Sequence, residues 1–193
     1  AKEFFFQSGR RMNALREYVR TRPEVMQYAR FRAMCDATKK SWHTWNETAK
    51  AGNISATQFS EEVENVYLYA QWIAQEQMEV LLESCRAKEL KFYLDLPLGV
   101  NPDGFDAWRY KEFFAPKVNA GAPADSFFTK GQDWGFAPLH PRRTRELKYR
   151  YVIDHLRFQM RHTGLLRIDH VMGLHRLWWV PHGHPASAGA YVQ

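Results

Sequence analysis

The sequence lacks any apolar run near the roughly 20 residues that a membrane-spanning helix needs. Residues 1–20 carry charges throughout and contain no apolar stretch of the length that a signal peptide needs, so neither a membrane protein nor a secretory signal peptide is indicated. Cysteine is scarce, since Cys35 and Cys85 are the only two. Two cysteines do not make a disulfide framework, and we expect reduced thiols in a cytoplasmic protein.

Several motifs that would point to a cofactor or a serine nucleophile are also missing. No phosphate loop of the G-x-G-x-x-G or G-x-x-x-x-G-K-[ST] kind occurs, and no G-x-S-x-G nucleophile elbow. Four histidines cluster late in the chain, at positions 170, 175, 182 and 184. No cysteine lies near them and their spacing matches no helix-borne ligand pair, so we expect no metal site.

The chain is basic, with 27 Lys and Arg against 21 Asp and Glu and a formal net charge of +6. Such a balance could serve a nucleic-acid partner. The arginines, however, run from Arg10 to Arg176 with many acids between them. We therefore expect a solvated basic surface and no nucleic-acid partner. A basic helical protein that binds nucleic acid is the alternative from a different functional class.

The two ends read as cuts through a longer protein. The chain starts at Ala1 rather than Met and runs at once into the apolar stretch at residues 4–6. It stops at Gln193 with no closing element, and nothing in the sequence specifies an oligomeric state. We expect an internal piece of a larger chain.

Apolar periodicity predicts a largely helical first part. Residues 11–50 read as helical, with a new start at Pro23, because proline is tolerated in the first helical turn. Residues 60–88 give the clearest helix, since their apolar side chains recur at helical spacing behind Ser60 as a candidate N-cap. We expect a helical segment over residues 1–58 and part of a catalytic domain over residues 59–193.

The second part alternates strand and helix. Short apolar runs at residues 92–96 and 165–171 predict buried strands, and residues 146–163 predict a helix between them. Residues 98–145 are rich in Gly and Pro and predict a very long active-site loop. This order is a β-α-β unit with parallel strands. The expected fold class is α/β, a partial (β/α)8 barrel with about two to three of its eight strands, and its active site would lie where the strands end.

Two charged residues mark the end of the second strand. Arg167 and Asp169 are two apart and therefore point to the same face, while Ile168 points toward the helices. A charged pair on an inward face is costly to bury. An arginine would keep the carboxylate ionised, and a retaining glycosidase needs such a carboxylate to attack the anomeric carbon. The alternative is a buried ion pair that only joins the strands.

A glycine-flanked loop holds a second candidate cluster at residues 131–135. Trp134 could stack on the apolar face of a sugar ring while Gln132 bonds a sugar hydroxyl. The alternative is a tryptophan that merely packs the loop down.

Three stretches together resemble glycoside hydrolase family 77, the amylomaltases and disproportionating enzymes. Asp95-Leu96-Pro97 resembles the motif at the end of the family's third barrel strand. Residues 121–127 and 131–135 resemble its long loop, and residues 166–170, Leu-Arg-Ile-Asp-His, resemble the signature of its fourth strand. The order of the three, with the long loop between them, carries the resemblance.

The resemblance implies an activity and a set of roles. It implies a 4-alpha-glucanotransferase that moves α-1,4-glucan segments between maltooligosaccharides by a retaining double displacement, without metal or organic cofactor. Asp169 would be the nucleophile and Arg167 would orient it. The residues implied to bind substrate are Asp95, Asp125, Gln132, Trp134 and His170. The family's acid/base Glu and second stabilising Asp would lie beyond Gln193. An α-glucan hydrolase of the same superfamily is the nearer alternative.

The sequence departs from the family pattern in places. Ala124 stands where the family often has Pro, and residues 136–138, Phe-Ala-Pro, stand where Asn-Pro often follows the Trp-Gly. Residues 171–173, Val-Met-Gly, replace a frequent Phe-Arg-Gly. These changes bear on acceptor preference and leave the nucleophile in place.

Overall fold

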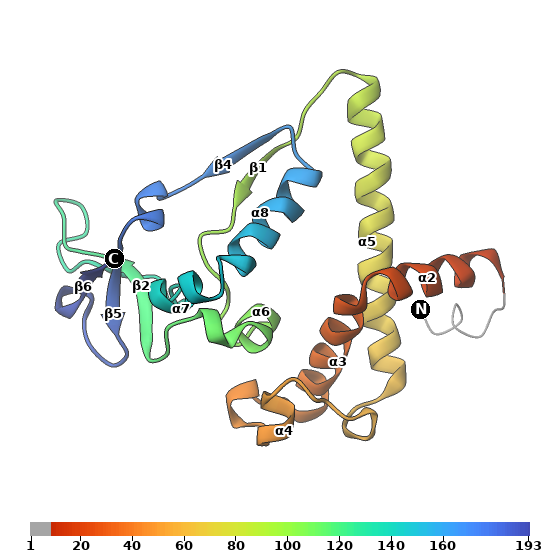
Figure 1. The fold of residues 1–193 in the computed structure, drawn as a ribbon, viewed down its shortest axis with the longest axis horizontal. Helices are drawn as coiled ribbons and strands as arrows, with labels where there is room; N and C mark the ends of the chain where they lie inside the picture. Colours follow the sequence, from red (N-terminus) through yellow and green to blue (C-terminus); the bar gives the residue numbers. More distant parts are fainter. Residues whose placement is uncertain (1–8) are drawn as a thin grey trace. The chain divides into compact units, whose positions relative to one another are not determined.

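The computed structural model describes residues 9–193, so the apolar stretch at residues 4–6 lies outside the described residues. The chain divides into two compact units, Ala1–Glu89 and Leu90–Gln193 (Figure 1). No helix of the described residues is both long and apolar enough to cross a membrane.

The first unit is helical. Its elements are α2 (Arg10–Thr21), α3 (Pro23–Thr38), η1 (Trp42–Thr44), α4 (Glu47–Lys50), η2 (Ala56–Gln58) and α5 (Glu61–Ala87). The predicted helix at residues 60–88 is confirmed, and α3 begins at Pro23 as expected. The prediction of helix throughout residues 11–50 is too simple. Lys39 takes a left-handed backbone (φ 52°) that ends α3, and only short helical turns follow.

Helix α5 belongs to this helical unit. Leu68 packs with Val25 and Ala29 of α3, and Trp72 packs with Met12 and Leu15 of α2, as two buried clusters. An ion pair of 2.9 Å joins Arg30 to the nearly buried Glu64 of α5. The unit boundary therefore falls after Glu89, later than the boundary that we expected after residue 58. The spacing of apolar residues within 60–88 predicts the helix, but it does not indicate that the helix packs against α2 and α3.

The second unit combines a parallel strand pair with a small antiparallel sheet. Its strands are β1 (Tyr93–Leu96), β2 (Val118–Ala122), β3 (Gln132–Asp133), β4 (Leu165–Ile168), β5 (Leu177–Pro181) and β6 (Ala190–Val192). Its helices are α6 (Phe105–Arg109), α7 (Pro141–Glu146) and α8 (Arg150–Arg161), with the 3-10 turns η3 (Lys111–Phe113), η4 (Val171–Leu174) and η5 (Ala186–Ala188). Strands β1 and β4 pair in parallel, and the other four form a sheet in the order β3-β2-β5-β6.

The predicted β-α-β unit is confirmed in β1, α8 and β4, with two adjustments. The helix expected from residue 146 starts at Arg150, because Lys148 and Tyr149 take left-handed backbone conformations (φ 54° and 56°) that separate α7 from α8. The second strand ends at Ile168, because the chain turns at His170. The parallel pairing of β1 with β4 fits the α/β class; that these strands form part of a closed barrel stays a prediction.

The prediction of a single loop at residues 98–145 is wrong. That stretch contains α6, α7 and two strands, and β2 pairs along Val118–Gly121 with β5 (Figure 1). Strand β2 is built mainly from small residues, Val-Asn-Ala-Gly-Ala, so it carries little apolar signal. Gly121 is required by this packing, since a Cβ there would overlap the carbonyl oxygen of Gln132 across the hairpin.

Candidate active site

The parallel pair β1–β4 presents two different faces. Asp95 lies opposite Arg167 in the register, and Tyr93 lies opposite Leu165. All four side chains are exposed, which places them on the open face of the pair. Helix α8 packs against the other face, where Leu96 and Ile168 line a cavity together with Leu156 of α8. Ile168 therefore lies on the helix side, as alternation along the strand predicts.

Arg167 joins two carboxylates on the open face. Its Nη1 donates to Asp95 Oδ2 at 3.1 Å and its Nη2 donates to Asp169 Oδ1 at 2.9 Å. The negative charge of Asp169, and to a smaller extent that of Asp95, raises the pKa of the Arg167 guanidinium above its ordinary value. The predicted shared face of Arg167 and Asp169 thus brings the two side chains into direct contact.

This charged cluster is not a buried ion pair. The side chains of Arg167, Asp95 and Asp169 are 44%, 60% and 59% exposed. The inward burial that we expected is therefore not found, because nothing within the unit Leu90–Gln193 covers the open face of β1–β4. Ion pairs as exposed as these contribute about 0–1 kcal/mol to stability. Strand stability alone is a weak reason for placing three charges at the strand ends.

His170 continues the cluster beyond Asp169. Its backbone N–H donates to Asp169 Oδ1 at 3.0 Å. Its imidazole meets the ring of Trp134 edge-on, with centroids 4.9 Å apart and planes at 87°. His170 therefore links the end of β4 to the loop that holds the second candidate cluster.

Trp134 and Gln132 contact each other. Trp134 Nε1 donates to Gln132 Oε1 at 3.0 Å, and the Trp134 ring stacks at 6.0 Å on Phe136. Trp134 is half-buried, so it supports the loop and still exposes part of its surface. Phe136 did not stand out as a site residue in the sequence; its position two residues after a loop tryptophan was the available signal.

Asp125 shapes the β2–β3 hairpin rather than joining the cluster. Its Oδ1 accepts hydrogen bonds from the backbone N–H groups of Phe127 (2.8 Å) and Phe128 (2.6 Å). Both are local bonds within one turn, of the kind that Asp favours. The turn leaves Phe127 90% exposed at the hairpin tip. A direct contact of Asp125 with substrate stays a prediction.

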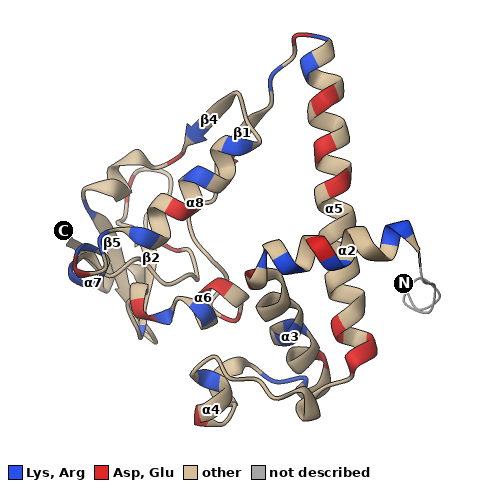
Figure 2. Cartoon of the chain, turned by 45° about the vertical axis from the view of Figure 1, so that its right-hand side comes forward, with Lys and Arg blue, Asp and Glu red and all other residues tan. Residues whose placement is uncertain are grey.

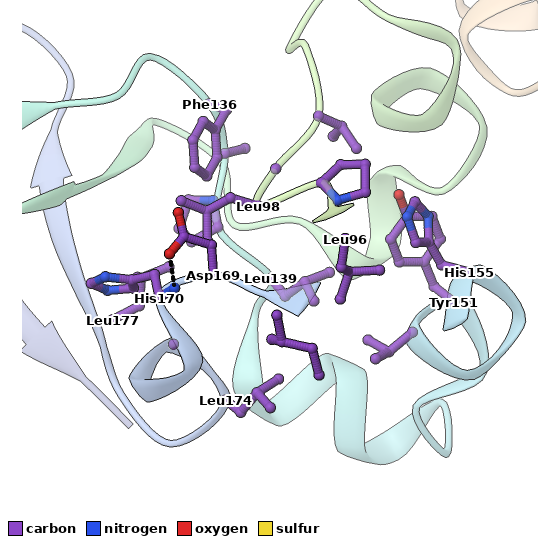
Figure 3. Close-up of a pocket in the computed structure, with 18 of the residues that line it drawn as sticks. Leu96, Leu98, Phe136, Leu139, Tyr151, His155, Asp169, His170, Leu174 and Leu177 are labelled. Atoms are coloured by element: carbon purple, nitrogen blue, oxygen red, sulfur yellow. Dashed lines mark hydrogen bonds between the residues drawn. The ribbon is translucent and has the colours of Figure 1, made fainter. Parts of the chain in front are cut away.

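A cavity of about 140 Å³ lies behind the strand ends (Figure 3). Its wall is mostly apolar and includes Leu96, Leu98, Phe136, Leu139 and Leu174, with Asp169 and His170 also on its lining. Sugars carry many hydroxyls that need polar partners, and so apolar a space offers few of them. In polarity, the open, charged face of β1–β4 suits a sugar better than this cavity does.

The late histidines do not form one group. His182 Nε2 pairs with Asn119 Oδ1 at 3.0 Å, while His175 Nε2 lies 2.9 Å from Gln193 Nε2. His184 bonds the backbone carbonyl of His182. Within residues 9–193, no three His, Cys, Asp or Glu side chains are grouped so as to hold a metal ion.

Replacing Trp134 by Ala is expected to weaken glucan binding more than folding. The change removes the ring that would stack on a sugar, and we expect KM for maltooligosaccharides to rise about tenfold, equivalent to about 1.4 kcal/mol. Trp134→Phe is the matched control, because it keeps an aromatic face and loses only the bond to Gln132. Kinetics and thermal unfolding of a complete enzyme containing this segment provide the check. A large drop in melting temperature with unchanged KM would favour a packing role.

Comparisons with known proteins complete the description of the site. The family model described as 4-alpha-glucanotransferase matches residues 1–193. The 4-alpha-glucanotransferase of Mycobacterium tuberculosis is 34% identical over 173 residues, covering 86% of this chain and 24% of that protein. That of Haemophilus influenzae is 33% identical over 150 residues, covering 77% and 22%. The chain thus spans about a quarter of the length of these curated relatives.

Solved structures agree in fold. An amylomaltase from Streptococcus agalactiae in complex with acarbose superposes with a TM-score of 0.86 at 22% identity, over 96% of this chain and 40% of that one. The amylomaltase from Corynebacterium glutamicum superposes with a TM-score of 0.77 at 28% identity, over 97% and 26%. Taken with the match along the whole sequence, these similarities show that the chain belongs to the 4-alpha-glucanotransferase family, glycoside hydrolase family 77.

Proposed function

We propose that this chain forms part of an enzyme that transfers α-1,4-glucan segments between maltooligosaccharides by a retaining double displacement. The observation that carries the proposal is the Asp169 carboxylate at the end of a parallel strand, fixed by Arg167 and open to solvent. Membership in the 4-alpha-glucanotransferase family supports the same activity. No metal or organic cofactor enters the proposal.

The proposed chemistry has two steps. In the first, a carboxylate oxygen of Asp169 attacks the anomeric carbon of the donor, the glycosidic C–O bond breaks, and the leaving oxygen takes a proton from a carboxylic acid. In the second, the acid of the first step, now a carboxylate, takes the proton from the 4-hydroxyl of an acceptor sugar as that oxygen attacks the same anomeric carbon. The ester bond to Asp169 breaks, and the Asp169 carboxylate is restored.

The remaining cluster residues would bind the glucan around Asp169. Asp95 shares Arg167 with the nucleophile and presents its other oxygen on the open face. Trp134 and Gln132 reach the cluster through the ring of His170. We propose that Asp95, Trp134 and Gln132 contact sugar rings and hydroxyls, that the His170 ring supports Trp134, and that Asp125 acts by holding the hairpin that carries Gln132.

We also propose that β1 and β4 are adjacent strands of a (β/α)8 barrel. The open face carries exposed Tyr93 and Leu165 beside the charged cluster, which suits a barrel interior. Helix α8 exposes Ile153 and Met160 on one flank and Phe158 on the other, as a helix between two neighbouring helices of a barrel layer would.

The two cysteines support a cytoplasmic location, which we propose with the activity. Cys35 and Cys85 form no disulfide in the structure, which suits a reducing compartment.

The positive charge is more concentrated than the spread of arginines along the sequence indicated. Residues 142–161 contain seven basic residues against two acidic ones and so hold +5 of the chain's +6, mostly on α7 and α8 (Figure 2). Glu146 pairs with both Arg142 and Arg143 at 3.1 and 2.8 Å. A nucleic-acid partner would leave the strand-end cluster without a role, and we do not propose one.

Product analysis tests the proposed transfer. Incubating maltotriose with a complete enzyme that contains this segment should release glucose and longer maltooligosaccharides while the number of reducing ends stays constant. A steady rise in reducing ends would instead indicate an α-glucan hydrolase. The two outcomes separate the proposed function from its nearer alternative.

A further inference from the structure

The two protein donors that reach Asp169 use the same carboxylate oxygen. Arg167 Nη2 at 2.9 Å and the His170 backbone N–H at 3.0 Å both donate to Oδ1. Among residues 9–193, no donor bonds Asp169 Oδ2. The carboxylate is therefore held by one oxygen and presents the other.

The backbone at His170 is unusual for a residue other than glycine. Its φ and ψ are 46° and 47°, in the left-handed region that His tolerates better than most residues and β-branched residues tolerate worst. The chain leaves the strand direction here, and η4 starts at the next residue. The turn keeps the His170 N–H beside the carboxylate that precedes it instead of within a strand ladder.

Contacts on both sides hold this conformation. The imidazole rests edge-on against Trp134, and the His170 carbonyl accepts a hydrogen bond from Gly173 N–H at 2.8 Å. The imidazole Nε2 is buried and has no hydrogen-bond partner among residues 9–193. A buried, unpartnered Nε2 is poorly suited to bonding a sugar hydroxyl, whereas the backbone N–H is already aimed at Asp169. Strained backbone held from several sides is frequent at active sites.

We propose that His170 is a positioning residue whose left-handed backbone, together with Arg167, fixes Asp169 Oδ1 and so selects Oδ2 as the attacking atom. This inference rests on the proposed role of Asp169 as nucleophile. After the attack, Oδ2 becomes the ester oxygen and Oδ1 the ester carbonyl oxygen. When the acceptor displaces Asp169, negative charge returns to the carboxylate, and the two donors on Oδ1 stabilise it.

Three variants of a complete enzyme containing this segment separate the backbone of His170 from its ring. Asn and Gly both accept a left-handed backbone, so His170→Asn and His170→Gly should keep kcat within about tenfold of wild type. Val does not, so His170→Val should lower kcat by about 10²-fold with KM changed less than threefold, because a small misplacement of a reacting group has that effect. Lys117→Val is the control: Lys117 is also left-handed (φ 60°) but lies before β2, and its kcat should match wild type.

Each outcome decides the proposal. Equal loss of kcat in the Asn, Gly and Val variants would assign the role to the imidazole and overturn it, as would wild-type kcat in His170→Val. An inactive wild-type enzyme, or an Asp169→Asn variant at wild-type rate, would instead overturn the proposed function. If His170→Val fails to fold, the structure of the wild-type glycosyl-enzyme decides. The ester carbonyl oxygen should stay within hydrogen-bond distance of Arg167 and the His170 N–H; an ester formed through that same oxygen would overturn the inference.

Discussion

Changing Asp169 to Asn in a complete enzyme containing this segment is expected to lower the transfer rate by roughly 10⁴-fold or more. An amide cannot form the glycosyl ester through which the proposed double displacement passes. The fold should survive, because the Asn Oδ1 can still accept from Arg167 and from the His170 N–H as the carboxylate does. Glucose release from maltotriose measures the effect.

A matched control for this change lies on α8. Asp154 is 66% exposed and reaches Arg157 only at 4.0 Å, so Asp154→Asn removes one carboxylate without touching the strand ends. Its transfer rate and melting temperature should equal those of wild type. Near-wild-type disproportionation by the Asp169 variant would refute Asp169 as the nucleophile.

The 193-residue chain by itself is expected to have no measurable glucanotransferase activity. A nucleophile also needs a carboxylic acid that protonates the leaving oxygen, and that proton transfer alone contributes about 10²–10⁴ in rate. Asp95 is the carboxylate tied to the same Arg167 (3.1 Å). That Asp95 oxygen is already engaged in the Arg167 ion pair, so we do not assign Asp95 as the acid.

The surface of the isolated chain supports the same expectation. Each strand of the β1–β4 pair has one unpaired edge among the described residues, and Tyr93, Leu165 and Ile168 are 63%, 59% and 40% exposed. Exposed apolar strands with free edges favour association, so the chain should also tend to aggregate. Size-exclusion chromatography and a maltotriose assay on the purified chain check both points. Turnover comparable to that of a complete enzyme would show that Asp95 or Asp125 is the acid/base.

The parts of the fold that sequence reasoning predicted are those with a local signal. Helix α5 and the β1–α8–β4 unit follow from apolar spacing within one segment. The antiparallel sheet was missed because its central pairing joins β2 to β5, more than fifty residues later, and β2 is made mostly of small side chains. Non-local pairing of this kind leaves no periodic trace in either strand.

The candidate site divides in the same way. Spacing along one strand predicted that Arg167 and Asp169 share a face. In the structure, Arg167 Nη2 lies 2.9 Å from Asp169 Oδ1. The bond from Arg167 to Asp95 depends on the β1–β4 register, and the contact between Trp134 and His170 depends on how the hairpin folds back. The left-handed turn at His170 carries no signal such as glycine, so sequence reasoning could not anticipate it.

The most direct test of the central claim is to trap the covalent intermediate. A 5-fluoro maltosyl fluoride should react with a complete enzyme containing this segment, because the sugar bond to the carboxylate forms as fluoride leaves and then turns over slowly. Peptide mass spectrometry should find the added sugar on the peptide that holds Asp169, and fragmentation should place it on that residue. A label on any other carboxylate, Asp95 included, would contradict the assignment of Asp169 as the nucleophile.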